Sequence, residues 1–340
     1  MNEEAREVSK KVAAIEDIVE VRESGPLQQL LANQAAWITI AVIIIGIVMA
    51  VLSSAFLTRN NLFNITRNLS FVGIMALGMT PVIITAGIDL SVGSVMGISG
   101  IILGLVLGAQ QPLWLGITMA LFTALLVGAL NGFLIAYVRL NPFVVTLGML
   151  SLARSQAIVF SNNKMLFDFG PQSDAFLALG GGRTFGIPNS VIAMVVLGLI
   201  IWFFMRFTAW GQYVYAVGGN EEAARLTGVP IRWIKMSVYM LAGLMAGVAA
   251  VFMVGWLGAV TNALGTGDEL RVIAATVIGG ANLLGGAGSA YGAIIGAVLI
   301  EEIRNALILA GVDAFWQGTF VGAFIIFAVL LERIRNYRKS

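Results

Sequence analysis

Apolar stretches separated by short polar ones run from residue 37 to residue 331. A membrane-spanning helix needs about 20 mostly apolar residues, so the charge-poor stretches near this length predict ten spans. They cover residues 37–56, 68–85, 92–109, 113–138, 142–160, 191–207, 236–257, 270–281, 289–309 and 315–331. The eighth is short and the fifth contains Arg154. The pattern predicts an all-α polytopic membrane protein with about 10 transmembrane helices.

The remaining stretches divide the chain into a membrane domain, residues 37–335, and two polar ends. Residues 1–36 carry Val8, Val12, Ile15 and Val19 at helical spacing, which favours an amphipathic segment on the cytoplasmic surface, with a disordered tail as the alternative. Residues 161–190 form an external loop, either a docking surface or a plain connector, and residues 336–340 form a cytoplasmic tail. With the amino terminus inside, 13 of the 20 basic residues lie in interior segments. This bias predicts a multi-pass protein of the cell inner (plasma) membrane with both termini cytoplasmic.

Composition narrows the function. Hydrophobic residues make up 59% of the chain and charged residues 11%, and the mean hydropathy is +0.92. There is no histidine or cysteine, which excludes thiol nucleophiles and zinc sites of the usual ligands. No lysine follows a glycine, so there is no Walker P-loop. We therefore expect neither catalytic residues nor a metal or cofactor on this chain, and the near balance of 20 basic and 18 acidic residues gives no reason to expect nucleic acid.

A short helix is predicted at residues 220–228, between two spans. An asparagine can cap it, two acids suit the positive end of its dipole, a glycine can end it, and Pro230 prevents its continuation. A helix this short is marginal by itself, so a partner outside the chain is expected to support it. Its spacing, Glu-Ala-Ala-x-x-x-Gly, resembles the coupling helix of ATP-binding-cassette (ABC) importer permeases. The residues assigned to coupling are Asn220, Glu221, Glu222, Ala223, Ala224, Arg225 and Gly228.

The chain has 40 glycines, and close helix packing explains most of them. Two blocks, residues 85–97 and 278–292, share the pattern Gly-x-(Asp/Asn)-Leu-x-x-Gly and are typical of helices broken near a transport path. The residues assigned to the path or to a helix break are Gly87, Asp89, Ser91, Gly93, Ser94, Asn282, Gly285 and Gly286. The blocks follow the second and eighth predicted spans, so an inverted repeat stays an open question.

Charged residues inside the membrane domain need partners. Asp89 either caps the helix that begins near residue 91 or pairs with backbone amides, or else it contacts a sugar hydroxyl in the path. Glu301, Glu302 and Arg304 form either a structural network or a gate. Asp268, Glu269 and Arg271 suit the start of the eighth span and also offer contacts to an external partner.

Four segments together resemble the permease subunits of ribose-type sugar ABC importers. They are residues 85–97, 141–155, 216–231 and 273–297, which read TAGIDLSVGSVMG, NPFVVTLGMLSLARS, AVGGNEEAARLTGVPI and IAATVIGGANLLGGAGSAYGAIIGA. The resemblance implies a second permease subunit, expected to be a second copy, with two cytoplasmic ABC ATPases and a periplasmic sugar-binding protein. It also implies that a monosaccharide crosses between the permeases and that ATP and magnesium bind the ATPase.

Two alternatives remain open. A branched-chain amino-acid ABC permease shares this architecture, and residues 87–91 favour a monosaccharide by resemblance only. An ion-coupled secondary transporter has no need of a coupling helix, so the element at 220–228 favours the ABC class.

Overall fold

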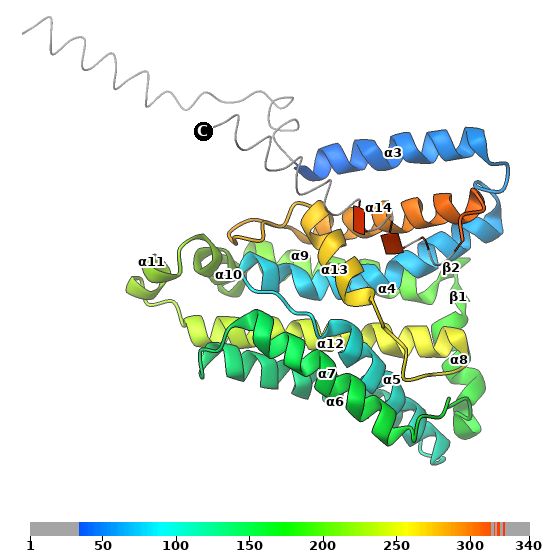
Figure 1. Ribbon diagram of the computed structural model, residues 1–340, viewed down its shortest axis with the longest axis horizontal. Coiled ribbons are helices and arrows are strands. Elements are labelled where there is room, and N and C mark those ends of the chain that lie inside the picture. Colours follow the sequence, from blue (N-terminus) through cyan, green and yellow to red (C-terminus); the bar gives the residue numbers. More distant parts are fainter. Residues whose placement is uncertain (1–33, 314–315, 317, 320–321, 324–340) are drawn as a thin grey trace, which may run out of the picture.

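The computed structural model describes residues 34–313, 316, 318–319 and 322–323, and this part of the chain is almost entirely helical (Figure 1). The main elements are α3 (Gln34–Leu52), α4 (Arg59–Ile84), α5 (Val92–Gly108), α6 (Leu113–Ala136), α7 (Pro142–Phe160), η1 (Gly170–Gln172), α8 (Ser173–Gly181), β1 (Arg183–Thr184), β2 (Ile187–Pro188), α9 (Asn189–Phe207), α10 (Ala209–Gly219), α11 (Glu221–Leu226), α12 (Ile231–Leu257), α13 (Asp268–Ile278) and α14 (Ala290–Leu309).

Local signals in the sequence set several helix ends. The side chain of Asn141 accepts a hydrogen bond from the backbone of Phe143 at the start of α7. Ser289 caps α14 in the same way. Gly258 ends α12 with a positive φ of 65°, a conformation that glycine adopts without strain. These ends follow from residue type alone.

Six of the described helices, α3, α4, α6, α7, α9 and α12, are long and apolar enough to cross a membrane, and α5 is a shorter apolar helix. The predicted all-α, multi-span class is confirmed. The eighth predicted segment forms α13, which has 11 residues. At 1.5 Å per residue it is about 16 Å long, roughly half of the hydrocarbon layer, so α13 is a half-membrane helix and not a span. The tenth predicted span and the two polar ends lie almost wholly outside the described residues.

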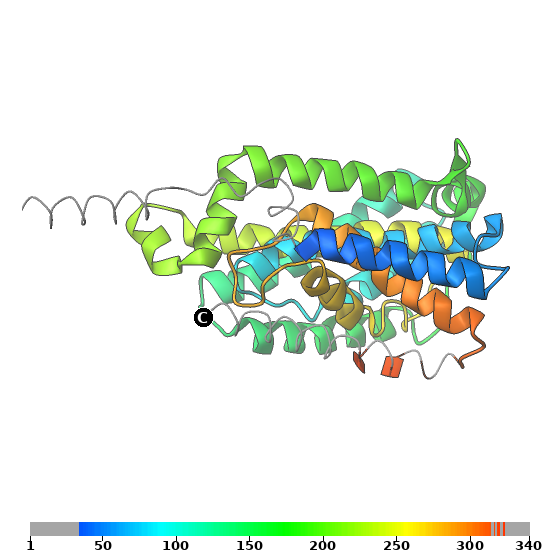
Figure 2. The ribbon, with the colours of Figure 1, turned by 90° about the horizontal axis from the view of Figure 1, so that it is seen from above.

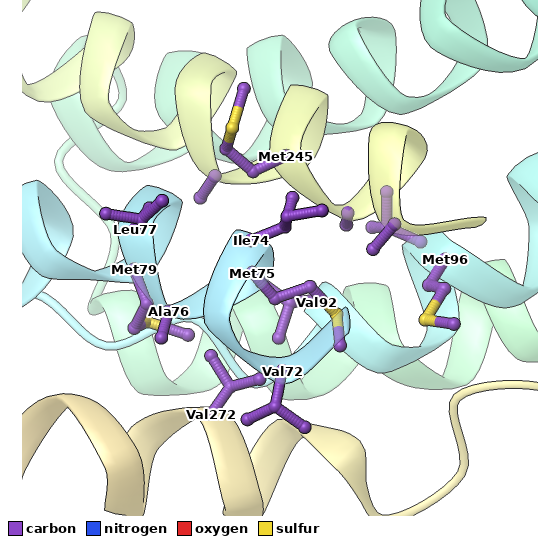
Figure 3. Packing of buried hydrophobic residues seen from close by; sticks show 14 of the residues in the cluster. Val72, Ile74, Met75, Ala76, Leu77, Met79, Val92, Met96, Met245 and Val272 are labelled. Atoms are coloured by element: carbon purple, nitrogen blue, oxygen red, sulfur yellow. The ribbon is translucent and has the colours of Figure 1, made fainter. Parts of the chain in front are cut away.

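Helices α4 and α12 form the centre of the bundle. In α4, 89% of the most apolar window is buried, against 17% in α3. An apolar helix in a membrane can face lipid, as α3 does, or protein, and α4 is packed against α9, α12, α13 and α14. Figure 3 shows Val72, Met75 and Met79 of α4 among Val92 of α5, Met245 of α12 and Val272 of α13. Every other element is positioned around this pair.

Two sets of helices, α4–α6 and α12–α14, pack against each other reciprocally. The short helix α5 packs against α6 of its own set and against α12, while α13 packs against α14 and against α4. Likewise α6 packs on α12 and α14 packs on α4, and α4 and α12 run in opposite directions (Figure 1). This is the arrangement of an inverted repeat that pairs α4–α6 with α12–α14. In it the segment before α5 corresponds to the segment before α13, so the glycine blocks at 85–97 and 278–292 are not equivalent positions.

The two ends of the bundle differ. Helices α10 and α11 lie at one end, and α8 with the β1–β2 hairpin lies at the other, as both views show (Figures 1 and 2). The 161–190 stretch is therefore a folded structure at the α8 end. There α8 packs on α12, where the backbones of Gly180 and Gly255 touch.

Candidate functional site

Helix α11 is short, capped and held to the bundle on one side. The side chain of Asn220 accepts a hydrogen bond from the backbone of Ala223 at 2.9 Å, as its position predicts. Glu221 pairs with Lys235 of α12 at 2.6 Å. After the helix, Gly228 has a φ of 83°. The predicted helix is present, with Gly228 as the turn that ends it.

The outer face of α11 has no neighbour in the described chain. The helix touches α10 and α12, with Ala224 buried against them. Leu226 is 83% exposed, and Glu222 pairs with Arg225 of the same helix, at 3.1 Å. A large apolar side chain beside charged ones, on a helix that protrudes from the bundle, has the composition of a contact surface for another protein.

Directly before α11, Gly218 of α10 lies against two distant segments. A Cβ atom at Gly218 would overlap the carbonyl oxygen of Ile84, the last residue of α4, and would lie 2.6 Å from the backbone nitrogen of Gly286. That nitrogen donates a hydrogen bond to the same Ile84 oxygen at 2.9 Å. We call this contact of Gly218, Ile84 and Gly286 the glycine junction. It joins the α10–α11 arm to the end of α4 and to the loop that leads into α14.

The loop from residue 279 to 289 is shaped to make this contact. Gly285 and Gly286 have φ of 93° and 79°, and Asn282 accepts a hydrogen bond from the backbone of Leu284. Tyr215 of α10 donates to the carbonyl oxygen of Gly288 at 2.8 Å. Asn282, Gly285 and Gly286 therefore form a turn packed against α10. The same turn reaches the start of the first block, since a Cβ atom at Gly285 would lie 3.1 Å from the Cβ of Ala86.

Asp89 lies in the other block, in the extended segment between α4 and α5. Its Oδ1 accepts hydrogen bonds from the backbone nitrogen of Ser91 at 2.8 Å and from the hydroxyl of Ser91 at 2.6 Å. Ser91 also accepts from Asn131 of α6 at 2.9 Å, and Ser94 donates to the Ser91 carbonyl oxygen. Asp89 is 1% exposed, and its contacts are those of a carboxylate paired with a backbone amide just before α5, whose N-cap residue Ser91 makes no side-chain capping bond. Asn131 was missed, and its signal was a polar side chain inside an apolar span.

Gly87 and Gly93, on either side of Asp89, allow other segments to approach the backbone closely. A Cβ atom at Gly87 would meet the hydroxyl of Tyr239, and one at Gly93 would overlap the carbonyl oxygen of Gly265 and a carboxylate oxygen of Glu269. Gly265 and Glu269 flank the start of α13. We call the contact of Gly93 with Gly265 the central crossing, because it brings together the amino-terminal ends of α5 and α13.

Arg154 of α7 holds the segment that leads into α13. It donates hydrogen bonds to the carbonyl oxygens of Asn262 and Leu264, at 2.7 and 2.6 Å. Carbonyl groups outside regular structure need hydrogen-bond partners where they are shielded from water, and Arg154 supplies two of them in this partly buried segment. The sequence marked Arg154 only as a charge inside a span, and the structure gives the reason for it.

A cavity of about 370 Å³ lies beside the central crossing, between α4, α12, α13 and α14. Ion pairs line it, Arg271 with Asp268 at 3.2 Å and Arg304 with Glu301 at 3.3 Å. Trp256 and Phe71 stack in its wall, with ring centroids 5.7 Å apart. The charged residues at 268–271 and those at 301–304, which are far apart in the sequence, thus border one cavity. The aromatic pair was not predicted from the sequence. Hydrogen-bonding groups beside aromatic faces suit a small polar ligand.

A bundle of membrane-spanning helices with a half-membrane helix, a polar cavity and a protruding capped helix defines a membrane transport permease. The chain belongs to the family described as the permease component of the branched-chain amino acid transport system, whose sequence profile matches residues 61–329. This match covers well over half of the 340 residues.

Several curated proteins are similar over most of their length. The ribose import permease of Escherichia coli K12 is 38% identical over 294 residues, which cover 86% of this chain and 92% of the relative. The fructose import permease of Rhizobium meliloti is 34% identical over 315 residues, 90% and 88% of the two chains. The L-arabinose ABC transporter permease of Azospirillum brasilense is 33% identical over 286 residues, 84% of each. The predicted resemblance to ribose-type import permeases is confirmed.

Proposed function

We propose that this chain is the transmembrane permease subunit of an ABC importer for a monosaccharide. In this proposal two copies form the path in the inner membrane, with the α11 end and both termini in the cytoplasm. A periplasmic binding protein delivers the sugar to the α8 end. A separate ABC ATPase, which binds ATP and magnesium, contacts α11.

The observation that supports the proposal is the connection of α11, through α10, to the end of α4 and to the loop between α13 and α14. Asn220 is the single residue between α10 and α11, and Gly218 of α10 contacts the end of α4 and the loop before α14. Movement of α11 by an ATPase that closes on ATP would therefore displace the end of α4 and the loop before α14 together. A conformational change needs an interaction that differs between two states, and ATP binding on the partner supplies it.

The sugar class is supported by the relatives, which include permeases that import ribose, fructose and arabinose. The cavity lined by Asp268, Arg271, Glu301 and Arg304 suits hydroxyl groups. It is also the observation that favours a second candidate, since a zwitterionic amino acid matches paired charges and the family carries a branched-chain amino acid name. An ion-coupled secondary transporter leaves the exposed face of α11 without a role.

Transport in vesicles tests the proposal. The chain, co-purified with its ATPase and binding protein, is reconstituted with ATP on the ATPase side, and uptake of labelled ribose, fructose, arabinose and leucine is measured. We expect ATP-dependent uptake of one of the sugars that persists when ionophores collapse ion gradients. Uptake of leucine alone would establish the amino-acid alternative. Uptake that needs an ion gradient and no ATP would overturn the ABC assignment.

A further inference from the structure

A second cavity, of about 260 Å³, lies at the α11 end between the α6–α7 turn, α11 and the start of α12. We call it the basic cavity, because its charged lining consists of four cations and one carboxylate. These residues are Arg139, Arg225, Arg232, Lys235 and Glu221. The transport path and the glycine junction do not use it.

Two of the four cations have no carboxylate partner among the described residues. Lys235 pairs with Glu221 at 2.6 Å and Arg225 pairs with Glu222 at 3.1 Å. In the part of the chain that the structure describes, Arg139 and Arg232 form no ion pair, and Arg232 lies over the ring of Tyr137 at 5.9 Å. The cavity thus has an excess of positive charge that no described side chain neutralises.

The backbone of Arg139 is held in an unfavourable conformation. Its φ is 65°, in the left-handed region that non-glycine residues seldom adopt. Such a conformation is strained and is found mainly where surrounding structure imposes it, often at binding sites. At this turn it accompanies an arginine in the lining of the basic cavity.

The surroundings of the cavity are those of a membrane boundary. Val138, Leu140 and Phe143, next to it in the α6–α7 turn, are 46–52% exposed apolar residues. Glu222 and Leu226, which face outward on α11, do not line it, so it lies on a different side of α11 from the exposed apolar tip. We propose that the basic cavity binds the phosphate group of an anionic membrane lipid. Guanidinium groups match phosphate oxygens in pairs, and basic pockets between helices at this boundary bind anionic headgroups.

A bound headgroup would also touch the coupling arm. Arg225 belongs to α11, and Lys235 holds α11 through Glu221. Phosphate in the cavity would share both cations with these carboxylates. Lipid composition would therefore influence the position of α11, a consequence that rests on the proposed function, whereas lipid binding itself does not.

Lipid retention provides the test. The full transporter is reconstituted in phosphatidylcholine vesicles with or without phosphatidylglycerol, and the lipid that stays bound after gentle extraction is measured by native mass spectrometry. We expect phosphatidylglycerol to be retained in preference to phosphatidylcholine. Arg232→Gln should weaken its retention about fivefold, and the double change with Arg139→Gln about 25-fold, from about 1 kcal/mol per cation.

Arg206→Gln is the matched control, because Arg206 is an exposed arginine in the last turn of α9 that does not line the cavity. Retention that falls equally in this control, or in no variant, would overturn the proposal. Arg139→Gly guards against misfolding, since glycine adopts the positive φ freely while the charge is lost.

Two further results would also overturn the lipid assignment. One is tight binding of labelled inorganic phosphate to the wild type in phosphatidylcholine vesicles, which would identify a soluble phosphate. The other is loss of the co-purifying ATPase from the double variant with unchanged lipid retention, which would assign these cations to the ATPase.

Discussion

The glycine junction and the central crossing are both places where glycines let two backbones touch, and they are held in different ways. At the junction, backbone atoms of Gly218, Ile84 and Gly286 meet directly, with one hydrogen bond between the last two. At the crossing, Gly93 and Gly265 touch, and charged side chains hold the surroundings through the Arg154 hydrogen bonds and the Asp268–Arg271 pair.

This difference indicates that the two contacts have different roles in transport. Backbone segments in direct contact cannot move independently of one another, so the junction can transmit displacement from α10 to α4 and to the loop before α14. Side-chain hydrogen bonds can exchange partners, so the crossing can exist in two arrangements. We expect substitutions at the junction to abolish uptake, and substitutions at the crossing to reduce uptake only partially.

Gly218→Ala should have the largest effect and abolish uptake. The new methyl group has no space beside Ile84 and Gly286, and the overpacking costs about 1–3 kcal/mol of stability. Gly219→Ala is the matched control, because a Cβ atom there meets nothing within 4 Å. Uptake at equal membrane abundance measures both. Normal uptake by Gly218→Ala would remove the junction from the mechanism.

Glu222→Lys should reduce uptake at least tenfold while the protein still inserts in the membrane. The change replaces an exposed carboxylate at the positive end of α11 and puts a lysine next to Arg225. Glu221 pairs with Lys235 of the bundle, whereas Glu222 is exposed and pairs with Arg225 of its own helix, so Glu222 is the acid on the outer surface of α11. Retention of the ATPase in a pull-down, with uptake in parallel, gives the measurement. Full retention together with wild-type uptake would contradict a docking role for α11.

Arg154→Gln should destabilise the crossing by about 2–3 kcal/mol, because two carbonyl oxygens lose a charged donor. We expect a lower thermal midpoint and partial uptake, with the junction intact. Arg59→Gln is a suitable control, since Arg59 is an exposed arginine at the first residue of α4. An unchanged midpoint would show that other groups satisfy Asn262 and Leu264.

Asp89→Asn should have the smallest effect, under about 1 kcal/mol. The amide oxygen can accept the hydrogen bond from the Ser91 backbone in place of the carboxylate. Asp89→Ala removes the acceptor and should cost more. Uptake rates for several sugars provide the readout. A changed order of sugar preference in Asp89→Asn would return Asp89 to direct contact with substrate.

The parts of the site that the sequence predicted are those set by near neighbours. The α11 cap and its acids occupy consecutive positions, and Asp89 accepts a hydrogen bond from the backbone of Ser91, two residues on. The contacts of Arg154 lie 108 and 110 residues away, and no local pattern identifies them. The glycine junction was missed for the same reason. The short length of α13 was also hidden, since residues 272–300 carry no charge to mark where the helix stops.

Gly218 also bears on how this chain can change over generations. Every other amino acid has a Cβ atom, so no single substitution at this position, however conservative, leaves Ile84 and Gly286 where they are. A tolerated replacement would need a second change that moves one of those two backbones, and neither step alone would be neutral. We therefore expect natural variants to differ at the adjoining Gly219 long before they differ at Gly218.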